Sequence, residues 1–301
     1  MRSCVLTSSL LIAAVARAQA PDSVGVRAQG MAGAFTAVAD DATATWWNPA
    51  GLATGAYFNA IIEYGRLTDG DGSRGGFSVA FPALGLSYYR MTVSEMQPSG
   101  STAGSAGSRQ DPAALNVRSV DLSQFGATVG QSVGRYLVVA STLKLLRGAG
   151  ETQAGLDLGS MAALGPLRLG VMLRNVSEPT FGEGDAAVTL RRQVRAGAAL
   201  NVPGRSSLFA GATLAVDADF RSVPSAAGDE RRVAAGAEVW LWKRAIGARA
   251  GISGSTVGDS RTATSGGISA MVRQGLFVEG QLTGGSDATR RGWSTALRVT
   301  F

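Results

Sequence analysis

The chain of 301 residues lacks histidine altogether and contains a single cysteine, Cys4. Without histidine it cannot build a serine–histidine–aspartate triad, and with one cysteine it cannot build an internal disulfide or a histidine–cysteine zinc site. Carboxylate chemistry and oxygen-ligated calcium stay open. We therefore predict a protein that is not an enzyme and that carries no cofactor and no metal.

Long apolar runs and clusters of one charge are also missing. No segment beyond the N-terminus approaches the roughly 20 consecutive apolar residues of a transmembrane helix. Charged residues make up 17% of the chain, and the basic residues behind the net charge of +6 are scattered singly or in pairs. Such a distribution does not favour nucleic-acid binding.

The N-terminus has the pattern of a secretory signal peptide. Arg2 gives a short basic region, an apolar stretch covers 5–15, and the tripeptide A-Q-A, which ends at Ala20, matches the small-residue cleavage site. The pattern predicts a cleaved signal peptide over 1–20 and a mature chain that begins at Pro21. The alternative is a buried N-terminal helix, which the cleavage motif disfavours.

From residue 56 onward, apolar residues recur at every second position. In the C-terminal stretch, Trp293, Leu297 and Val299 alternate with polar or small residues, and Phe301 ends the chain on the same face. This period is that of β-strands with one apolar and one polar face. Most of the segments that show it have the ~9–11 residues that a tilted strand needs to cross a bilayer. The fourteen segments are 56–66, 75–81, 84–93, 119–131, 135–147, 152–163, 166–175, 190–202, 206–220, 230–242, 245–254, 263–273, 276–284 and 291–301.

The connections between these segments alternate in length. Every second one is a tight turn, such as Pro82-Ala83, and the others are mostly longer, up to the segment 94–118. Outer-membrane barrels have this asymmetry, with short periplasmic turns and longer external loops. Because hydrocarbon offers no hydrogen-bond partner, a sheet within it must close on itself. We predict an all-β fold, a closed antiparallel transmembrane β-barrel of about 14 strands over 56–301, integral to the outer membrane of a Gram-negative (diderm) bacterium.

In such a barrel the apolar face meets outer-membrane lipid and the polar face lines the lumen. Charges of both signs in a narrow lumen are expected to pair with one another; alternatively, their surplus of arginine attracts an anionic head group. The terminal aromatic Phe301 resembles the signal by which the barrel-assembly machinery recognises its clients, so this machinery is an expected partner. The predicted lumen charges are Lys144, Arg168, Arg174, Arg195, Asp217, Asp219, Glu238, Arg249, Arg273, Glu279 and Arg298.

Residues 21–55, which we call the hatch, do not follow the strand pattern. A lumen enclosed by fourteen strands is too wide for the wall side chains to fill easily, so we expect the hatch to fold into it. Gly30 and Gly33 would allow its backbone to approach other groups closely.

A short helix is expected near the end of the hatch. Asp40 or Asp41 can cap it, and it would run to Trp47. The step Asn48-Pro49 ends it, because a residue before proline is pushed out of the helical region. Trp46 and Trp47 would then serve as apolar anchors of the plug.

The hatch sequence G-V-R-A-Q-G-M-A-G-A-F-T-A-V-A-D-D-A-T-A-T-W-W-N-P-A-G-L-A resembles the N-terminal region of the FadL-type outer-membrane transporters and the related PorV/PorQ-like proteins. The resemblance rests on G-M-A-G-A-F, on A-D-D-A, and on the motif N-P-A followed by Gly51-Leu52; elsewhere it is architectural. It implies a 14-stranded barrel whose N-terminal hatch includes Asn48, Pro49 and Ala50. FadL-type proteins pass long-chain fatty acids and other hydrophobic molecules by passive diffusion, whereas PorV-like proteins serve type IX secretion.

Two functions follow from this resemblance. The first is a passive channel for hydrophobic small molecules, with an apolar path between hatch and wall lined by Phe35, Trp46, Trp47 and Phe58. The second is a PorV/PorQ-like accessory barrel whose external loop 98–110 binds a secretion-system protein, either cargo or translocon. A third class, an outer-membrane enzyme, would depend on the neighbouring carboxylates of Asp217 and Asp219, since barrel hydrolases generally use a histidine that this chain lacks.

Overall fold

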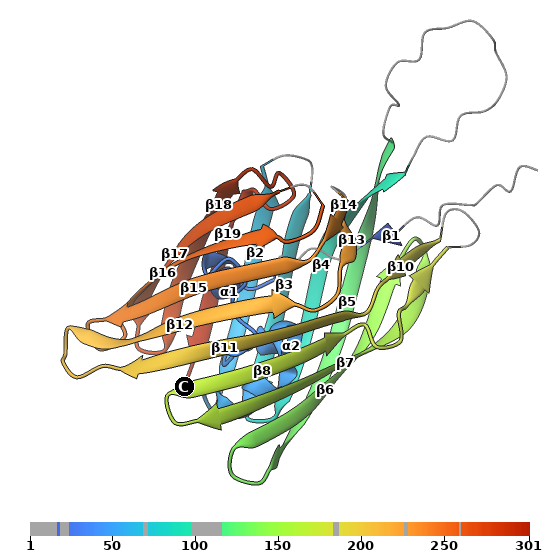
Figure 1. Ribbon diagram of the computed structural model, residues 1–301. Helices are drawn as coiled ribbons and strands as arrows, with labels where there is room; N and C mark the ends of the chain where they lie inside the picture. Colours follow the sequence, from blue (N-terminus) through green and yellow to red (C-terminus); the bar gives the residue numbers. More distant parts are fainter. Residues whose placement is uncertain are drawn as a thin grey trace, which may run out of the picture.

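The computed structural model of the protein describes residues 17–18, 24–68, 72–97, 116–182, 187–225, 228–258 and 260–301. Fourteen long strands form one closed antiparallel barrel, and the hatch lies inside it (Figure 1). The predicted fold, a closed barrel of 14 strands with a small helical hatch in its lumen, is confirmed.

The barrel strands follow one another around the sheet in chain order, and the last of them pairs with the first. They are 8 to 18 residues long. Each of the fourteen predicted segments overlaps one of them. The strands are β2 (Asn59–Leu67), β3 (Ser73–Phe81), β4 (Leu84–Gln97), β5 (Asn116–Val133), β6 (Leu137–Gly148), β7 (Glu151–Leu164), β8 (Leu167–Arg174), β11 (Gln193–Pro203), β12 (Phe209–Asp219), β15 (Arg232–Leu241), β16 (Ile246–Ser255), β17 (Thr262–Arg273), β18 (Leu276–Gly285) and β19 (Gly292–Thr300).

Alternating side chains give the barrel an apolar outer face and a polar lumen. On β6, Leu143 and Leu145 are 65% and 55% exposed, whereas Thr142 and Lys144 beside them are buried inside. The same alternation runs through most of the barrel strands. A continuous belt of exposed aliphatic side chains is unfavourable in water but matches the hydrocarbon of a bilayer, so the sheet is a transmembrane barrel.

The two ends of the barrel differ in the way that the connection lengths predict. One end carries the tight turns, such as 82–83, 165–166 and 274–275. The other end carries most of the longer connections, two of which contain short strands of their own: β9 (Thr180–Phe181), β10 (Val188–Leu190), β13 (Val223–Ser225) and β14 (Gly228–Glu230). Following the asymmetry of outer-membrane barrels, we assign the tight turns to the periplasm and the longer connections to the outside.

Two of the predicted segments lie largely outside the described residues. The external loop 98–110 is one of them. The signal peptide 1–20 is the other: only β1 (Arg17–Ala18), which pairs in parallel with β10, is described there, so cleavage stays a prediction. Among the described residues, no helix is both long enough and apolar enough to cross a membrane.

The barrel closes where the end of the chain meets the start of the sheet. The backbone N–H of Phe58 donates to the carbonyl of Phe301 at 3.2 Å, and that of Phe301 donates to the carbonyl of Phe58 at 3.0 Å. The ring of Phe58 stacks on Phe301 and meets the edge of Phe81, with centroids 6.1 and 5.5 Å apart. An aromatic cluster therefore marks the periplasmic end of the closing strands, as expected for side chains at a membrane interface.

If Phe301 is the assembly signal, Phe301→Ala should lower the fraction of chains assembled in outer membranes severalfold, because a strand-terminal aromatic would be lost. The measurement is the heat-modifiable fraction on electrophoresis of outer-membrane preparations. Phe81→Ala is the matched control, since it removes an exposed ring from the same cluster. Equal losses in both variants would contradict the special position of Phe301.

Candidate functional site

The described part of the hatch, 24–55, is a compact plug of three short helices. They are α1 (Val26–Gly30), α2 (Ala44–Trp47) and the 3-10 helix η1 (Pro49–Thr54). Residues 24–52 are buried throughout, apart from the half-buried Asp40. The abundance of alanine, glycine and threonine explains how so short a segment packs this tightly, because small side chains let backbone and wall approach one another.

The helix predicted to begin at Asp40 or Asp41 is shorter than expected, because α2 begins only at Ala44. The carboxylate of Asp41 accepts a hydrogen bond from the backbone N–H of Thr43 at 2.9 Å. Such a local bond to the residue two places on favours a turn over a helix. The helix does end at Trp47: Asn48 has the extended backbone (φ −164°, ψ 102°) that the following proline imposes.

Asn48 joins the hatch to itself and to the barrel wall. Its side-chain N–H groups donate to the carbonyl oxygens of Thr36 in the hatch (2.9 Å) and of Ser160 in β7 (3.0 Å). Its side-chain oxygen accepts from the backbone N–H of Ala50 at 3.2 Å. The residue is fully buried. Only a short amide supplies two donors and an acceptor in this space, which gives a physical reason for asparagine at the start of the N-P-A motif.

The variant Asn48→Asp should weaken the hatch by roughly 2–3 kcal/mol at neutral pH, because a buried carboxylate would face two carbonyl oxygens instead of donating to them. Burial and repulsion raise the pKa of such a carboxyl in the folded state, so the defect should be fullest at neutral pH and fade as acidification protonates the group. Limited proteolysis of the hatch at pH 7 and pH 5 measures this. Equal cleavage of variant and wild type at pH 7 would contradict the prediction.

Arg27 carries a second set of contacts between hatch and wall. Its guanidinium binds Glu238 of β15 through two parallel bonds, Nε to Oε2 at 2.7 Å and Nη2 to Oε1 at 2.8 Å. Within the hatch it also pairs with Asp40 and, at 3.3 Å, with Asp41. From the opposite side, Arg168 of β8 reaches Asp40 at 3.3 Å. One hatch arginine is thus shared among three carboxylates in the interior of the barrel.

The pKa values of the two hatch carboxyls reflect this arrangement. Burial by itself would raise the pKa of Asp40, but Arg27 and Arg168 outweigh burial and hold it below the ordinary value. For Asp41, burial prevails over the attraction of Arg27 and raises the pKa. Asp40 is therefore the carboxylate whose charge supports the closed hatch at neutral pH.

Wall side chains also accept hydrogen bonds directly from the hatch backbone. The carboxylate of Glu63 in β2 accepts from the N–H of Gly25 at 2.9 and 3.0 Å. The carboxylate of Asp217 in β12 accepts from the N–H groups of Phe35 (3.1 Å) and Thr36 (2.9 Å). These contacts satisfy backbone donors of the hatch just before α1 and in the turn that begins at Phe35.

Three of the four aromatics predicted to line a ligand path lie together in the lumen. Phe35 meets Trp47 edge to face, with centroids 6.1 Å apart, and both are buried with Trp46. The guanidinium of Arg174 lies 4.6 Å from the ring centroid of Trp46 and donates to its backbone carbonyl at 2.9 Å. The fourth aromatic, Phe58, is not in this group, because it belongs to the rim cluster with Phe81 and Phe301.

Most of the other predicted lumen charges form ion pairs, either with one another or, for Lys144, with Asp157, which was not predicted. Buried ion pairs join Lys144 to Asp157 (2.7 Å), Arg195 to Asp219 (2.7 Å), Arg298 to Glu279 (2.9 Å) and Arg249 to Glu238 (3.5 Å).

The two carboxylates Asp217 and Asp219 have different partners. Asp217 accepts hydrogen bonds from the hatch backbone, whereas Asp219 forms an ion pair with Arg195. Among the described residues there is no group of three or more histidine, cysteine, aspartate or glutamate side chains placed to bind a metal.

One predicted lumen charge is wrong. Arg273 is exposed at the periplasmic end of β17, where the register shifts between Met271 and Arg273 and reverses the alternation. The sequence analysis missed several charged side chains of the lumen, although they occupy the alternate strand positions that face inward. Glu63 and Arg232 are examples; the guanidinium of Arg232 donates to the carbonyl of hatch Gly33 at 3.2 Å.

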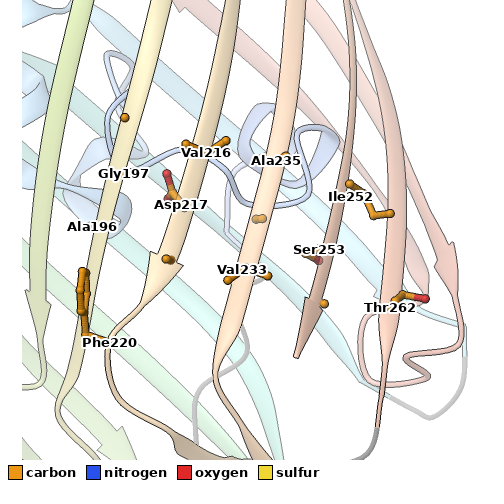
Figure 2. A pocket seen from close by; sticks show the side chains of 14 residues that line it. Ala196, Gly197, Val216, Asp217, Phe220, Val233, Ala235, Ile252, Ser253 and Thr262 are labelled. Atoms are coloured by element: carbon orange, nitrogen blue, oxygen red, sulfur yellow. The ribbon is translucent and has the colours of Figure 1, made fainter. Parts of the chain in front are cut away.

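The outer wall carries a shallow apolar depression of about 700 Å³ across β11, β12, β15, β16 and β17 (Figure 2). Small outward residues such as Ala196, Ala218 and Ala235 form its floor, and the larger exposed side chains of Phe220 and Ile252 line its edge. It faces the lipid side of the wall, so it is not a lumen path.

No protein-family model matches the sequence, and no curated protein matches it. Among solved structures, the CymD monoaromatic hydrocarbon channel superposes with a TM-score of 0.64 at 13% identity, covering 92% of this chain and 97% of that chain. Omp33 of Acinetobacter baumannii gives a TM-score of 0.46 (8% identity; 82% and 98% covered), and a mutant porin of Rhodopseudomonas blastica gives 0.40 (12%; 81% and 98%). At such identities the likeness extends to the fold alone: the chain has the barrel architecture of a known outer-membrane channel.

Proposed function

We propose that the protein is an outer-membrane channel for the passive passage of small hydrophobic molecules, closed by a hatch that must shift for passage. In this proposal the N-terminal segment 1–20 exports the chain and is removed. The wall provides the conduit, and the hatch provides the gate.

The observation that carries the proposal is how the hatch is attached. It fills the lumen, yet the barrel ladder begins only at Asn59, and the wall holds the hatch through side chains such as Glu238, Asp217 and Glu63. Hydrogen bonds and ion pairs of this kind can be exchanged for others without breaking the sheet. A plug that is part of the same chain but not of the ladder is suited to moving while the barrel stays intact.

The lining of the hatch favours hydrophobic passengers. Phe35, Trp46 and Trp47 are among the largest fully buried side chains of the described residues, and a shift of the hatch would expose them along the opened path. The similar fold of a monoaromatic hydrocarbon channel makes small apolar rings a reasonable first class of passenger. Rings stack well on such aromatic side chains.

Uptake of radiolabelled toluene by diderm cells that lack hydrocarbon channels tests this proposal. We expect faster uptake when the protein is expressed, and no change in the uptake of a charged solute of similar size. In planar bilayers the intact protein should conduct ions poorly, and a chain without residues 24–55 should conduct well.

Toluene uptake no faster than in cells without the protein would contradict the channel. The secretion-accessory alternative depends on the loop 98–110, which lies outside the described residues, so it enters here as an outcome of the test. A barrel that does not raise uptake but co-purifies with a secreted protein would favour it.

A further inference from the structure

Three outward arginines stand on alternate strands of one side of the barrel. Arg66 of β2, Arg90 of β4 and Arg147 of β6 are all exposed on the lipid-facing side, and we call them the arginine band. Register places small residues between them: Ser73 is opposite Arg66, and Gly75 and Ser123 lie on either side of Arg90. Ser123 is in turn opposite Arg147.

The outward residues on the periplasmic side of the arginine band are apolar. They form a continuous register row across β2 to β6, in which each residue pairs with the next. The row, with exposed fractions, is Ile62 (63%), Phe77 (47%), Tyr88 (36%), Phe125 (43%) and Leu145 (55%). An outward arginine is costly at the middle of a bilayer and nearly without cost at its interface, so this boundary marks the level of the outer head groups.

A groove of about 830 Å³ crosses this boundary, mainly over β2, β3 and β4, with further lining residues from β5, β18 and β19. Its floor is Gly75, which has no side chain, and its sides are the aromatic rings of Tyr64, Phe77 and Tyr88. At its polar end Arg90 pairs with Asp121 at 3.0 Å, with both side chains more than half exposed. Arg66 and Arg147 do not line the groove but are exposed on the same face beside it, so the three arginines of the band outnumber the one exposed aspartate at this end of the groove.

We propose that the groove and the arginine band bind a phosphorylated glycolipid of the lipid A type from the outer leaflet. Its acyl chains lie along the apolar row, and its phosphates are bound by Arg66, Arg90 and Arg147. Guanidinium groups match phosphate oxygens with paired hydrogen bonds, and the aromatic sides of the groove suit a sugar ring next to acyl chains.

The depression of Figure 2 gives a contrast within the same barrel. It also faces lipid, but its exposed lining is apolar, with Val216, Phe220 and Ile252 among its residues, and no arginine or lysine lines it. It fits acyl chains without selecting a head group. Selection by phosphate is therefore a property of the β2–β6 side.

Native mass spectrometry of the full chain in mild detergent tests the proposal, with bis-phosphorylated lipid A, its dephosphorylated form and phosphatidylglycerol as probes. We expect lipid A to bind the wild type, and to bind the triple variant Arg66→Gln/Arg90→Gln/Arg147→Gln at least about tenfold more weakly. The matched control is Arg135→Gln/Arg205→Gln/Arg273→Gln, which removes three exposed arginines at the periplasmic end and should bind like the wild type.

Each other outcome would overturn the proposal. Equal binding of dephosphorylated lipid A by the wild type would mean that acyl chains alone are bound, a result that does not depend on the folding of any variant. Equal binding of phosphatidylglycerol would mean a general anionic-lipid surface. Unchanged lipid A binding by the triple variant, or an equal loss in the periplasmic control, would remove the arginine band from the site.

Discussion

The variant Arg27→Ala should open the barrel at neutral pH and leave its strands assembled. The substitution removes the one cation that Glu238, Asp40 and Asp41 share, and the Glu238 and Asp41 side chains are only 1% and 3% exposed. Removing one partner of a buried ion pair costs about 3–5 kcal/mol. Arg168 still reaches Asp40 and Arg249 still reaches Glu238, but at 3.3 and 3.5 Å, so the closest cation of each carboxylate is lost. A cost of this size is comparable to the whole stability expected for a short docked segment, so the hatch should leave its closed position in most molecules.

Ion conductance in planar bilayers measures this release, because an emptied lumen admits water and ions. We expect small conductance for the wild type and a large, steady conductance for Arg27→Ala. The control is Arg90→Ala, which breaks the exposed pair with Asp121 and should cost no more than about 1 kcal/mol. If Arg27→Ala conducts no better than Arg90→Ala, the ion cluster does not hold the hatch.

The pH dependence of the two proteins should have opposite signs. In the wild type the pKa of Asp40 is held below its ordinary value, so its stabilising charge is fully present above the ordinary aspartate pKa and is lost as the pH falls through the lowered one. In Arg27→Ala the carboxyl of Asp41, whose pKa burial already raises in the wild type, loses the attraction of Arg27, so acidification protonates it and relieves part of the defect. Lowering the pH from 7 towards 4 should therefore close the variant and leave the wild type closed.

The barrel can be predicted from the sequence because it depends on the alternation of apolar and polar residues within each strand. Alternation with period two is set by the backbone itself, and a lipid environment forces such strands to close into one sheet. Strand number and chain-order pairing follow without any knowledge of distant contacts. The short strands β9, β10, β13 and β14 were not predicted, because segments of two or three residues are too short to show a period.

The contacts of the hatch could not be predicted in the same way. Parity tells which face of a strand a residue occupies, but not which hatch residue lies opposite it. Arg27 and Glu238 are 211 residues apart, and Asn48 and Ser160 are 112 apart, so their meeting depends on the path of the hatch through the lumen. The sequence contains no marker of that path beyond the glycines of the hatch and the step Asn48-Pro49.

Two errors of the sequence analysis, the placement of Phe58 and the omission of Glu63 and Arg232, could have been avoided from the alternation of residues along the strands. Phe58 precedes Asn59, which faces the lumen, so parity alone places its ring on the outer side. Glu63 and Arg232 share the inward parity of other lumen residues. Arg273 is different, because a register shift within β17 reversed the alternation, and nothing in the residue pattern marks that shift.

The variant Gly51→Ala should prevent the hatch from seating, with a cost of at least about 3 kcal/mol. A Cβ added to Gly51 would lie 1.6 Å from the carbonyl oxygen of Ala39 and 2.8 Å from its carbonyl carbon. These are backbone atoms of the hatch itself, so no side-chain rotation can relieve the contact. The 3-10 helix η1 would have to separate from the segment that precedes α2, and the bonds that Asn48 makes to both parts would break with it.

Gly280→Ala is the matched control, since a Cβ at Gly280 of β18 meets nothing within 4 Å. Both variants should assemble, as judged by heat-modifiable migration, because neither glycine is required for the strand ladder. Only Gly51→Ala should then conduct ions and expose the hatch to protease. Because the clash is between uncharged backbone and side-chain atoms and involves no titratable group, acidification should not restore closure in Gly51→Ala, whereas it should in Arg27→Ala. Closure of Gly51→Ala at pH 7 would mean that the hatch backbone adapts more readily than its packing indicates.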